Sequence, residues 1–337
     1  MDWNTFRIVQ RRLAASLVLV VMCNPFGVLP QTSLWQADKN VEIVVGASPG
    51  GSGDKTARLL QKIFKDDRLL SSSTTVVNKA GGGGTISRLY LNQHSGDAHY
   101  VAIAPLNILT NYITGVSQLS YRDLTPLAHL YDEYIAFAVR ADSALKTGRD
   151  LAEHLKRNPE SIAIAIATTL GNPNHIAAAL VMKANEGDVK RLKTVVFNSA
   201  GEATAALLGG HVDLVPSSVP VLLPTFRSGK IRIIGITSSQ RLSGVMAEIP
   251  TLKEQGINVV FGSWRGMVGP RGLGAAQVAY WEQTFSKVSQ SSEWARDLEA
   301  NYWVNTYRNS RATKDYWDEQ SKELETVLMG IGLAKKK

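Results

Sequence analysis

Residues 41–64 read VEIVVGASPGGSGDKTARLLQKIF, and they join a β-branched run to a glycine-rich loop and then to an amphipathic stretch. The run Val41–Val45 is typical of a short buried strand. After the loop, apolar side chains recur at helical spacing, at Ala57, Leu60, Ile63 and Phe64. A strand that enters a helix through a glycine turn is typical of α/β proteins, so this segment predicts an α/β fold with parallel strands.

The same alternation of strand and helix continues along the chain. Short apolar runs predict strands at 74–77, 100–104, 162–167, 194–197, 212–215 and 231–236. Helical spacing predicts helices at 86–91, 150–156, 175–184, 202–208, 277–288 and 314–328. The pattern restarts after residue 141, and the last two helices follow a separate segment that begins at residue 249. We therefore expect two α/β lobes, with the chain returning to the first lobe at its end.

The length of 337 residues fits two domains at roughly 150 residues each. We predict a leader over 1–37, a discontinuous first lobe of 38–141 and 245–337, and a second lobe of 142–244. Hydrophobic residues make up 44% of the chain and charged residues 20%, which is enough apolar mass for a core and argues against a disordered or collagen-like chain.

The charge and the scarcity of cysteine narrow the function further. The net charge is +8, but basic residues are interleaved with acidic ones, so we do not expect a nucleic-acid partner. Cys23 is the one cysteine, which leaves the rest of the chain without a disulfide, a thiolate metal site or a cysteine nucleophile. The six histidines form no HExxH motif or helical pair. We therefore expect no bound metal and no cofactor.

The first 37 residues have the layout of an export signal. Arg7, Arg11 and Arg12 precede an apolar stretch at 13–22. About ten apolar residues are too few to span a bilayer, since a span needs roughly 20. A short buried helix is the alternative. Residues 20–23, VVMC, resemble a bacterial lipoprotein box, so we expect a periplasmic protein in which Cys23 is a candidate for lipid attachment.

The glycine loop at 46–56, GASPGGSGDKT, admits several mechanisms. It matches the G-x-S-x-G elbow of serine hydrolases, but Pro49 follows Ser48 and lacks the N–H that the oxyanion hole needs. The end of a phosphate-binding P-loop is interrupted by Asp54, whose carboxylate would repel phosphate. Two interpretations remain open. One is a plain turn in which Asp54 caps the helix, and the other is an anion cradle in which glycine N–H groups and the helix dipole face a carboxylate.

Motifs distributed over nearly the whole chain after the leader resemble those of one family. They are PGG at 49–51 with Asp54 and Ala57-Arg58, VVNKAGGGGTI at 76–86, DLTP at 123–126, Gly171 with His175 and Ala177, LLGGHVD at 207–213, PTLKEQG at 250–256, and WRG at 264–266 with Gly269-Pro270. In this order and spacing, the chain resembles the extracytoplasmic solute receptors of tripartite tricarboxylate transporters, the Bug family.

The resemblance implies a two-lobed periplasmic binding protein of the type II-like, Venus-flytrap kind, with a ligand cleft between its lobes. It implies a monomeric receptor, not an enzyme, that captures a small organic carboxylate and delivers it to an integral membrane transporter. The residues that it places at the ligand are Ser48, Pro49, Gly50, Gly51, Ser52, Gly83, Gly84, Thr168, Thr169, Asn172, Ser199, Ala200 and Asp213. Backbone N–H groups would hold the carboxylate, so such a cleft needs no buried counter-charge.

Several positions depart from the family pattern. Ala47 and Ser48 stand where an aromatic residue and a proline are usual, and Ser199 replaces a glycine. The usual D-G-Y-T reads DAHY at 97–100. These changes leave open an unusual or larger ligand.

The sequence also leaves two other functions open and offers further candidate ligand residues. The alternative functions are a sensory module that presents its ligand to a membrane kinase, and an exported serine hydrolase built on Ser48. Arg227, Arg232 and Arg265 are candidates for a second ligand carboxylate, since a guanidinium binds carboxylates bidentately. Trp264 is expected either to wall the cleft or to pack between the lobes.

Overall fold

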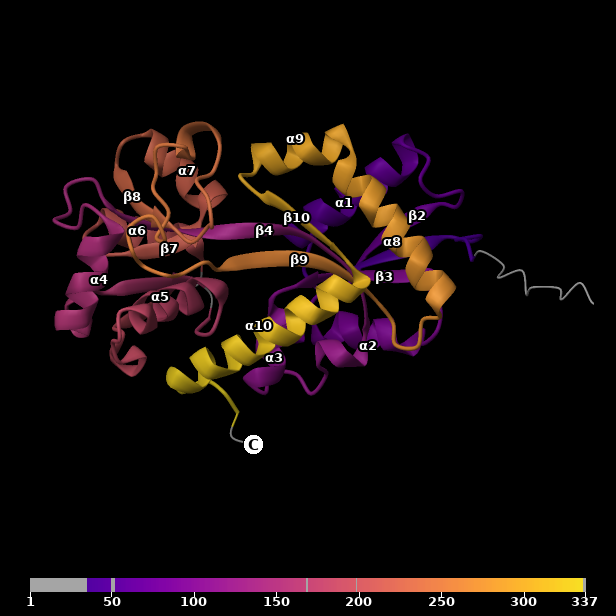
Figure 1. Cartoon of the computed structure of the whole chain (residues 1–337), viewed down its shortest axis with the longest axis horizontal. Helices are drawn as coiled ribbons and strands as arrows, with labels where there is room; N and C mark the ends of the chain where they lie inside the picture. The colour runs from indigo at the N-terminus through magenta and orange to yellow at the C-terminus, as the bar shows by residue number, and fades with distance from the viewer. Residues whose placement is uncertain (1–34, 50–51, 168, 198, 336–337) are drawn as a thin grey trace, which may run out of the picture. The chain divides into compact units, whose positions relative to one another are not determined.

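The computed structural model describes residues 35–49, 52–167, 169–197 and 199–335 (Figure 1). Most of the predicted leader, with Cys23, lies outside these residues. So do Gly50, Gly51 and Thr168, which were predicted at the ligand.

The first sheet contains the strand that precedes the glycine loop. Its order is β10-β4-β9-β3-β1-β2. The strands are β1 (Val41–Val45), β2 (Thr74–Asn78), β3 (Tyr100–Pro105), β4 (Thr125–Arg140), β9 (Gly262–Gly269) and β10 (Val304–Asn309). β1 pairs with β2 and β3 in parallel, as predicted, whereas β9 is antiparallel to both β3 and β4. The carboxyl ends of β1 and β3 therefore meet at one edge of the sheet.

β4 belongs to two sheets. Its residues 125–134 pair with β9, and its residues 135–140 pair with β7 (Val215–Ser218) and β8 (Ile231–Ile236). Beside the second sheet, β5 (Ile164–Ala167) and β6 (Thr194–Phe197) form a parallel pair, and Ala165 N–H donates to Leu214 O at 2.9 Å next to β7. Figure 1 shows β4 running from one sheet into the other. This strand was not predicted, and the predicted strand at 212–215 is wrong by three residues.

Thr237 joins the strands at the point where β4 passes between the sheets. The side chain is fully buried. Its hydroxyl accepts from Ile135 N–H at 2.9 Å and donates to Phe261 O at 2.6 Å. Its backbone N–H donates to Ile135 O, and its carbonyl accepts from Phe261 N–H, both at 3.0 Å. One threonine therefore links the middle of β4, the end of β8 and the residue before β9.

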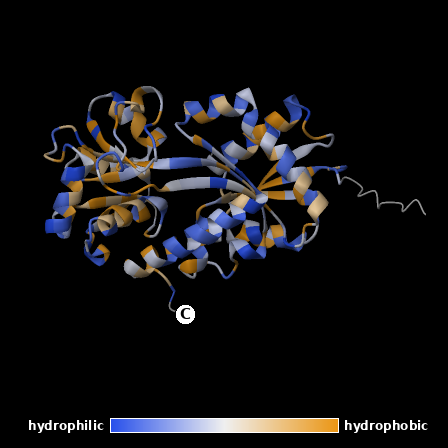
Figure 2. Ribbon diagram, viewed as in Figure 1, coloured by the Kyte–Doolittle hydropathy of each residue, from blue (hydrophilic) through white to orange (hydrophobic). Residues whose placement is uncertain are grey.

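Helices cover both faces of each sheet, as Figure 1 shows. Around the first sheet they are α1 (Ser52–Asp66), α2 (Thr85–Gln93), α3 (Asn107–Ile113), α8 (Ala275–Gln290), α9 (Ser292–Ala300) and α10 (Ser310–Gly330). Around the second they are α4 (Gly148–Arg157), α5 (Pro173–Ala184), α6 (Ala200–Leu208) and α7 (Val219–Arg227). Figure 2 shows hydrophobic and polar residues alternating along most of the helices, and in α1 the buried residues lie at helical spacing on one face.

Aromatic residues fill the core on both faces of the first sheet. Trp281 of α8 and Trp294 of α9 are buried on one face, with α1. On the other face, Trp264 of β9 stacks on Trp317 of α10 with ring centroids 4.6 Å apart, and both rings are fully buried. Trp264 therefore packs a strand against a helix within the core of the first sheet.

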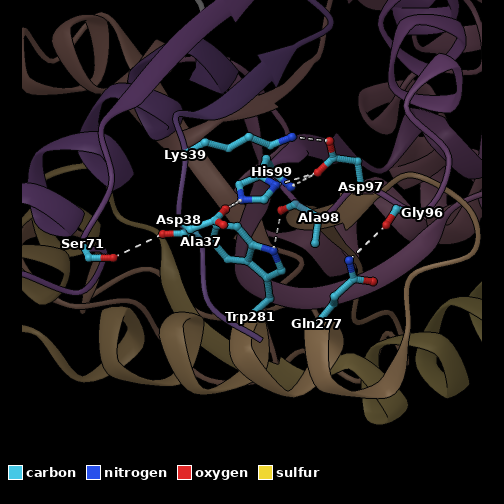
Figure 3. Close-up of polar contacts among 10 residues, drawn as sticks. All are labelled: Ala37, Asp38, Lys39, Ser71, Gly96, Asp97, Ala98, His99, Gln277 and Trp281. Atoms are coloured by element: carbon cyan, nitrogen blue, oxygen red, sulfur yellow. Dashed lines mark hydrogen bonds and ion pairs between the residues drawn. The ribbon is translucent and has the colours of Figure 1, made fainter. Parts of the chain in front are cut away.

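The segment before β1 is tied to the sheet by a buried histidine (Figure 3). His99 Nδ1 lies 2.6 Å from Asp97 Oδ1, and His99 Nε2 lies 3.0 Å from Asp38 Oδ1. Lys39 Nζ donates to the other oxygen of Asp97 at 3.0 Å. Burial opposes the charge of Asp97, but the hydrogen bonds from His99 and Lys39 outweigh burial and lower the pKa of Asp97 to about 2. His99, which belongs to the DAHY sequence that departs from the family pattern, thus anchors the segment before the first strand.

Candidate functional site

A pocket of about 280 Å³ lies at the edge of the first sheet where β1 and β3 end. Its walls come from the loop after β1, the glycine loop before α2, and the chain after β3. They include Gly46, Ser52, Gly83, Gly84, Arg88 and Arg265. The structure therefore brings together Ser52, Gly83 and Gly84, three of the residues predicted at the ligand.

Two glycines let the loops approach each other at this pocket. A Cβ on Gly46 would lie 2.6 Å from Ser87 Oγ and 3.0 Å from Gly84 Cα, closer than side chains allow. Gly84 has φ +88°, a conformation that residues with a Cβ rarely adopt. Ser87 Oγ donates to Gly84 O at 2.7 Å and so holds the turn in place.

Helices begin on two sides of the pocket. α1 starts at Ser52 and α2 at Thr85, so each directs the positive end of its dipole toward this region. Asp54, in the first turn of α1, is buried and accepts from Arg58 Nε at 2.9 Å and from Asn78 Nδ2 at 3.1 Å. Its carboxylate is thereby engaged outside the pocket walls, and the helix N-terminus remains favourable for an anion.

Arg265 is the one predicted arginine that lines the pocket among the described residues. Its Nη2 donates to Ser52 Oγ at 2.9 Å and lies 3.8 Å from Glu133 Oε2. Arg232 instead donates to backbone carbonyls at Ala141 and Leu145, and Arg227 is exposed on α7.

Arg88, on the second turn of α2, was not predicted from the sequence as a site residue. Its side chain lines the pocket although only 4% of the residue is exposed. The pocket wall therefore contains a buried cation, whereas the predicted cradle consisted of backbone N–H groups without a buried counter-charge. The position of Arg88 in the sequence could have identified it. Arg88 follows Thr85 by three residues, so the two side chains share one face of α2, and Thr85 directly follows the glycine loop.

Of the residues predicted at the ligand beyond residue 142, those that the structure describes lie outside the pocket walls. Asn172 Oδ1 caps α5 by accepting from His175 N–H at 2.9 Å, and Ser199 Oγ caps α6 by accepting from Glu202 N–H at 3.1 Å. Thr169 follows β5, and Ala200 is the first residue of α6. Since β5 and β6 are parallel, the loops after them meet at one edge.

Asp213, Ser48 and Pro49 do not lie in the loops after β5 and β6. Asp213 Oδ2 accepts from Ala163 N–H at 2.8 Å, at the start of β5 and thus at the opposite end of that strand from Thr169. Ser48 and Pro49 are exposed. Among the described residues, no hydrogen bond joins Ser48 to a histidine, so the contact that a serine nucleophile uses is not formed there.

The described ranges contain neither a metal-binding cluster nor a membrane-spanning helix. No group of three or more His, Cys, Asp or Glu side chains there could hold a metal ion. None of the helices formed by these residues is long and apolar enough to cross a membrane.

His175 supports the loop that follows β5. It is 5% exposed, and its Nδ1 accepts from Gly171 N–H at 3.0 Å, which requires an unprotonated Nδ1. Burial lowers the pKa of His175 to about 4. A neutral imidazole therefore holds this loop at neutral pH.

The stability of the protein should consequently fall as the pH drops from about 6.5 to about 4. In this window the unfolded chain binds a proton at His175 and the folded chain does not, at a cost of roughly 3 kcal/mol once the lower limit is reached. Urea denaturation at pH 7 and pH 5 measures the loss. His175→Gln should reduce the difference between the two pH values, whereas the exposed control His154→Gln should retain it. An unchanged difference in His175→Gln would contradict the assignment.

Comparison with known proteins identifies related sequences. A family model described as the tripartite tricarboxylate transporter family receptor matches residues 57–333. A Cupriavidus necator protein described as the UPF0065 protein in the gbd 5' region is 25% identical over 305 residues, covering 89% of this chain and 91% of the relative.

Solved structures share the fold. A TctC solute binding protein from Polaromonas has a TM-score of 0.76 at 23% identity, over 86% of this chain and 98% of its own. A Rhodopseudomonas palustris protein with adipate has a TM-score of 0.72 at 20% identity, over 88% and 98%. MatC of the same species with bound malate has a TM-score of 0.67 at 23% identity, over 86% and 99%. The predicted two-lobed periplasmic binding protein fold is thereby confirmed.

Proposed function

Because this chain belongs to the tripartite tricarboxylate transporter receptor family, a family of periplasmic solute-binding proteins, we propose that its pocket captures a small organic dicarboxylate. The receptor would then present the ligand to the membrane subunits of a transporter. Attachment of lipid at Cys23 would keep the receptor near those subunits.

The observation that carries this proposal is the positive character of the pocket. The two charged side chains among its described lining residues are Arg88 and Arg265, and the N-termini of α1 and α2 add the positive ends of two helix dipoles. A pocket with this lining favours an anion over a neutral sugar or amide.

The relatives suggest the size of the anion. The structural neighbours hold malate and adipate, which are diacids of four and six carbons. One carboxylate would lie against the loops of the first sheet. We assign the other to the loops after β5 and β6, which include Thr168, Thr169, Asn172, Ser199 and Ala200. The proposed site also includes Ser48, Pro49, Gly50 and Gly51, which precede α1 in the chain.

The proposal includes the predicted lobe division of 38–141 with 245–337, and 142–244, except that residues 135–140 of β4 pair with strands of the second lobe. The pairing of β4 with two sheets supports two lobes that move about the crossing near residue 135, so that occupancy of the cleft changes the surface that a transporter meets. Binding without turnover is part of the proposal, since capture and release require no chemical step. The proposed receptor acts as a monomer.

Calorimetric titration should detect saturable binding of succinate, malate or adipate to the purified chain after bound ligand has been removed by unfolding and refolding. Each neutral diamide should give no heat of binding, because it carries no charge for the arginines. Chromatography of the recovered ligand should show it unchanged. Silence for all three diacids, or conversion of a bound one, would refute the proposal.

A glycine pair locates the binding site. Gly84→Ala should weaken diacid binding at least tenfold, because its methyl group would lie 3.1 Å from Arg88 Nη1 and change the pocket wall. Gly256→Ala is the matched control, since Gly256 has nearly the same φ, +86°, but no atom within 4 Å of the added carbon. Equal affinities in the two variants would place the ligand elsewhere.

A further inference from the structure

Arg88 is a buried cation that pairs with no anion among the described residues. Its one hydrogen bond within the described part of the chain runs from Nη2 to Thr85 Oγ1 at 3.2 Å. Its Nε is buried and has no hydrogen-bond acceptor, and no carboxylate of the described residues lies within ion-pair distance. A guanidinium carries five N–H donors, so most of its hydrogen-bonding capacity is unused.

This arrangement is costly unless something else occupies the pocket. A guanidinium remains protonated in proteins, and a buried charge without a counter-charge costs several kcal/mol. Burial lowers the pKa of Arg88, which is the direction expected when water is removed and no anion replaces it. The exposed arginines Arg58 and Arg241, by contrast, each pair with a carboxylate.

The second cation of the pocket does not share this need. Arg265 lies 3.8 Å from Glu133 Oε2, and both side chains are mostly buried. The charge of Arg265 is therefore balanced within the protein, whereas that of Arg88 is not. The pocket has one uncompensated positive charge, and it is on α2, next to Gly84.

We propose that Arg88 is the specificity-determining residue of this receptor, and that its guanidinium forms an ion pair with one carboxylate of the bound diacid. The inference rests on the proposed function and deepens it. It adds an unpaired charged side chain to a site whose other donors are N–H groups, hydroxyls and Arg265, which is already paired with Glu133. The receptor then requires an anionic group at this end of the ligand, because a neutral amide there would leave Arg88 buried and unpaired.

Titration of succinate and adipate, each beside its monoamide, tests the proposal. The wild-type chain should prefer each diacid to its monoamide. Arg88→Gln should bind the diacids roughly 30-fold to 1,000-fold more weakly, as expected for a lost buried charge pair. It should also lose most of the preference. Arg88→Lys should recover part of the affinity, because it restores the charge but not the planar fork. Arg157→Gln, on an exposed arginine of α4, removes the same charge and should bind as the wild type does.

The melting temperature of the ligand-free protein provides a second test that does not depend on the binding variants. Arg88→Met should raise the melting temperature of the ligand-free protein, because it removes an unpaired buried charge, and should abolish most of the shift that adipate produces in the wild type. Wild-type affinity in Arg88→Gln, or a lower melting temperature in ligand-free Arg88→Met, would overturn the role of Arg88 and leave the proposed function intact. A wild-type chain that binds neither diacid would overturn both.

Discussion

Trp264→Ala should lower the free energy of unfolding by about 3–5 kcal/mol, the usual cost of removing a buried tryptophan. The indole is fully buried and stacks on Trp317, and its Nε1 donates to Gln320 Oε1. The truncation therefore removes apolar burial, a stacked pair and a buried hydrogen bond together. Urea denaturation followed by circular dichroism measures the loss.

A double-mutant cycle separates stacking from burial. Trp317→Ala should be destabilising by a similar amount, and the double variant should lose less than the sum by at least about 0.5 kcal/mol, because the stacked contact is counted twice in the single variants. Val260→Ala, at a side chain that is 47% exposed, should change stability little. A Trp264→Ala protein as stable as that control would contradict the packing of β9 against α10.

Thr237→Val should destabilise the protein by about 1–3 kcal/mol although it preserves the shape of the side chain. The valine cannot accept from Ile135 N–H or donate to Phe261 O, so two backbone groups in a fully buried position each lose a partner. Thermal and urea denaturation measure the effect.

Thr237→Ser is the matched control. It retains the hydroxyl and deletes a methyl group, so it should preserve both hydrogen bonds and lose only the smaller packing contribution. If Thr237→Ser were the less stable of the two variants, packing rather than hydrogen bonding would hold the crossing of β4 together.

Local sequence patterns predicted the strands and helices whose buried side chains are mostly apolar and regularly spaced. β1, α1 and β3 follow the expected alternation, because the two strands are apolar and the helix has one apolar stripe. β4 was missed because it contains Pro126 and the charged pair Asp132 and Glu133, which interrupt the apolar pattern. The structure compensates by burying Asp132 against His129 Nε2 at 3.1 Å, a contact that no local pattern contains.

The candidate site shows the same limit. The glycine loops were predicted because positive φ and close approach leave a compositional trace at Gly84 and its neighbours. Arg88 was missed because a single arginine on a helix is most often exposed, and its burial depends on β1, β3 and the first glycine loop packing against α2. Arg265 was predicted as a candidate, but its partner Glu133 lies on the unpredicted strand.

The passage of β4 through both sheets has a consequence for recombination between receptors. Residues 135–140 lie between β7 and β8, so a fragment that begins at residue 142 lacks a central strand of its own sheet. A chimaera that exchanged only 142–244 would have to pair a foreign sheet with the resident β4, register and Thr237 contact included. A lobe exchange is therefore expected to yield a folded receptor only when residues 135–140 are transferred together with 142–244.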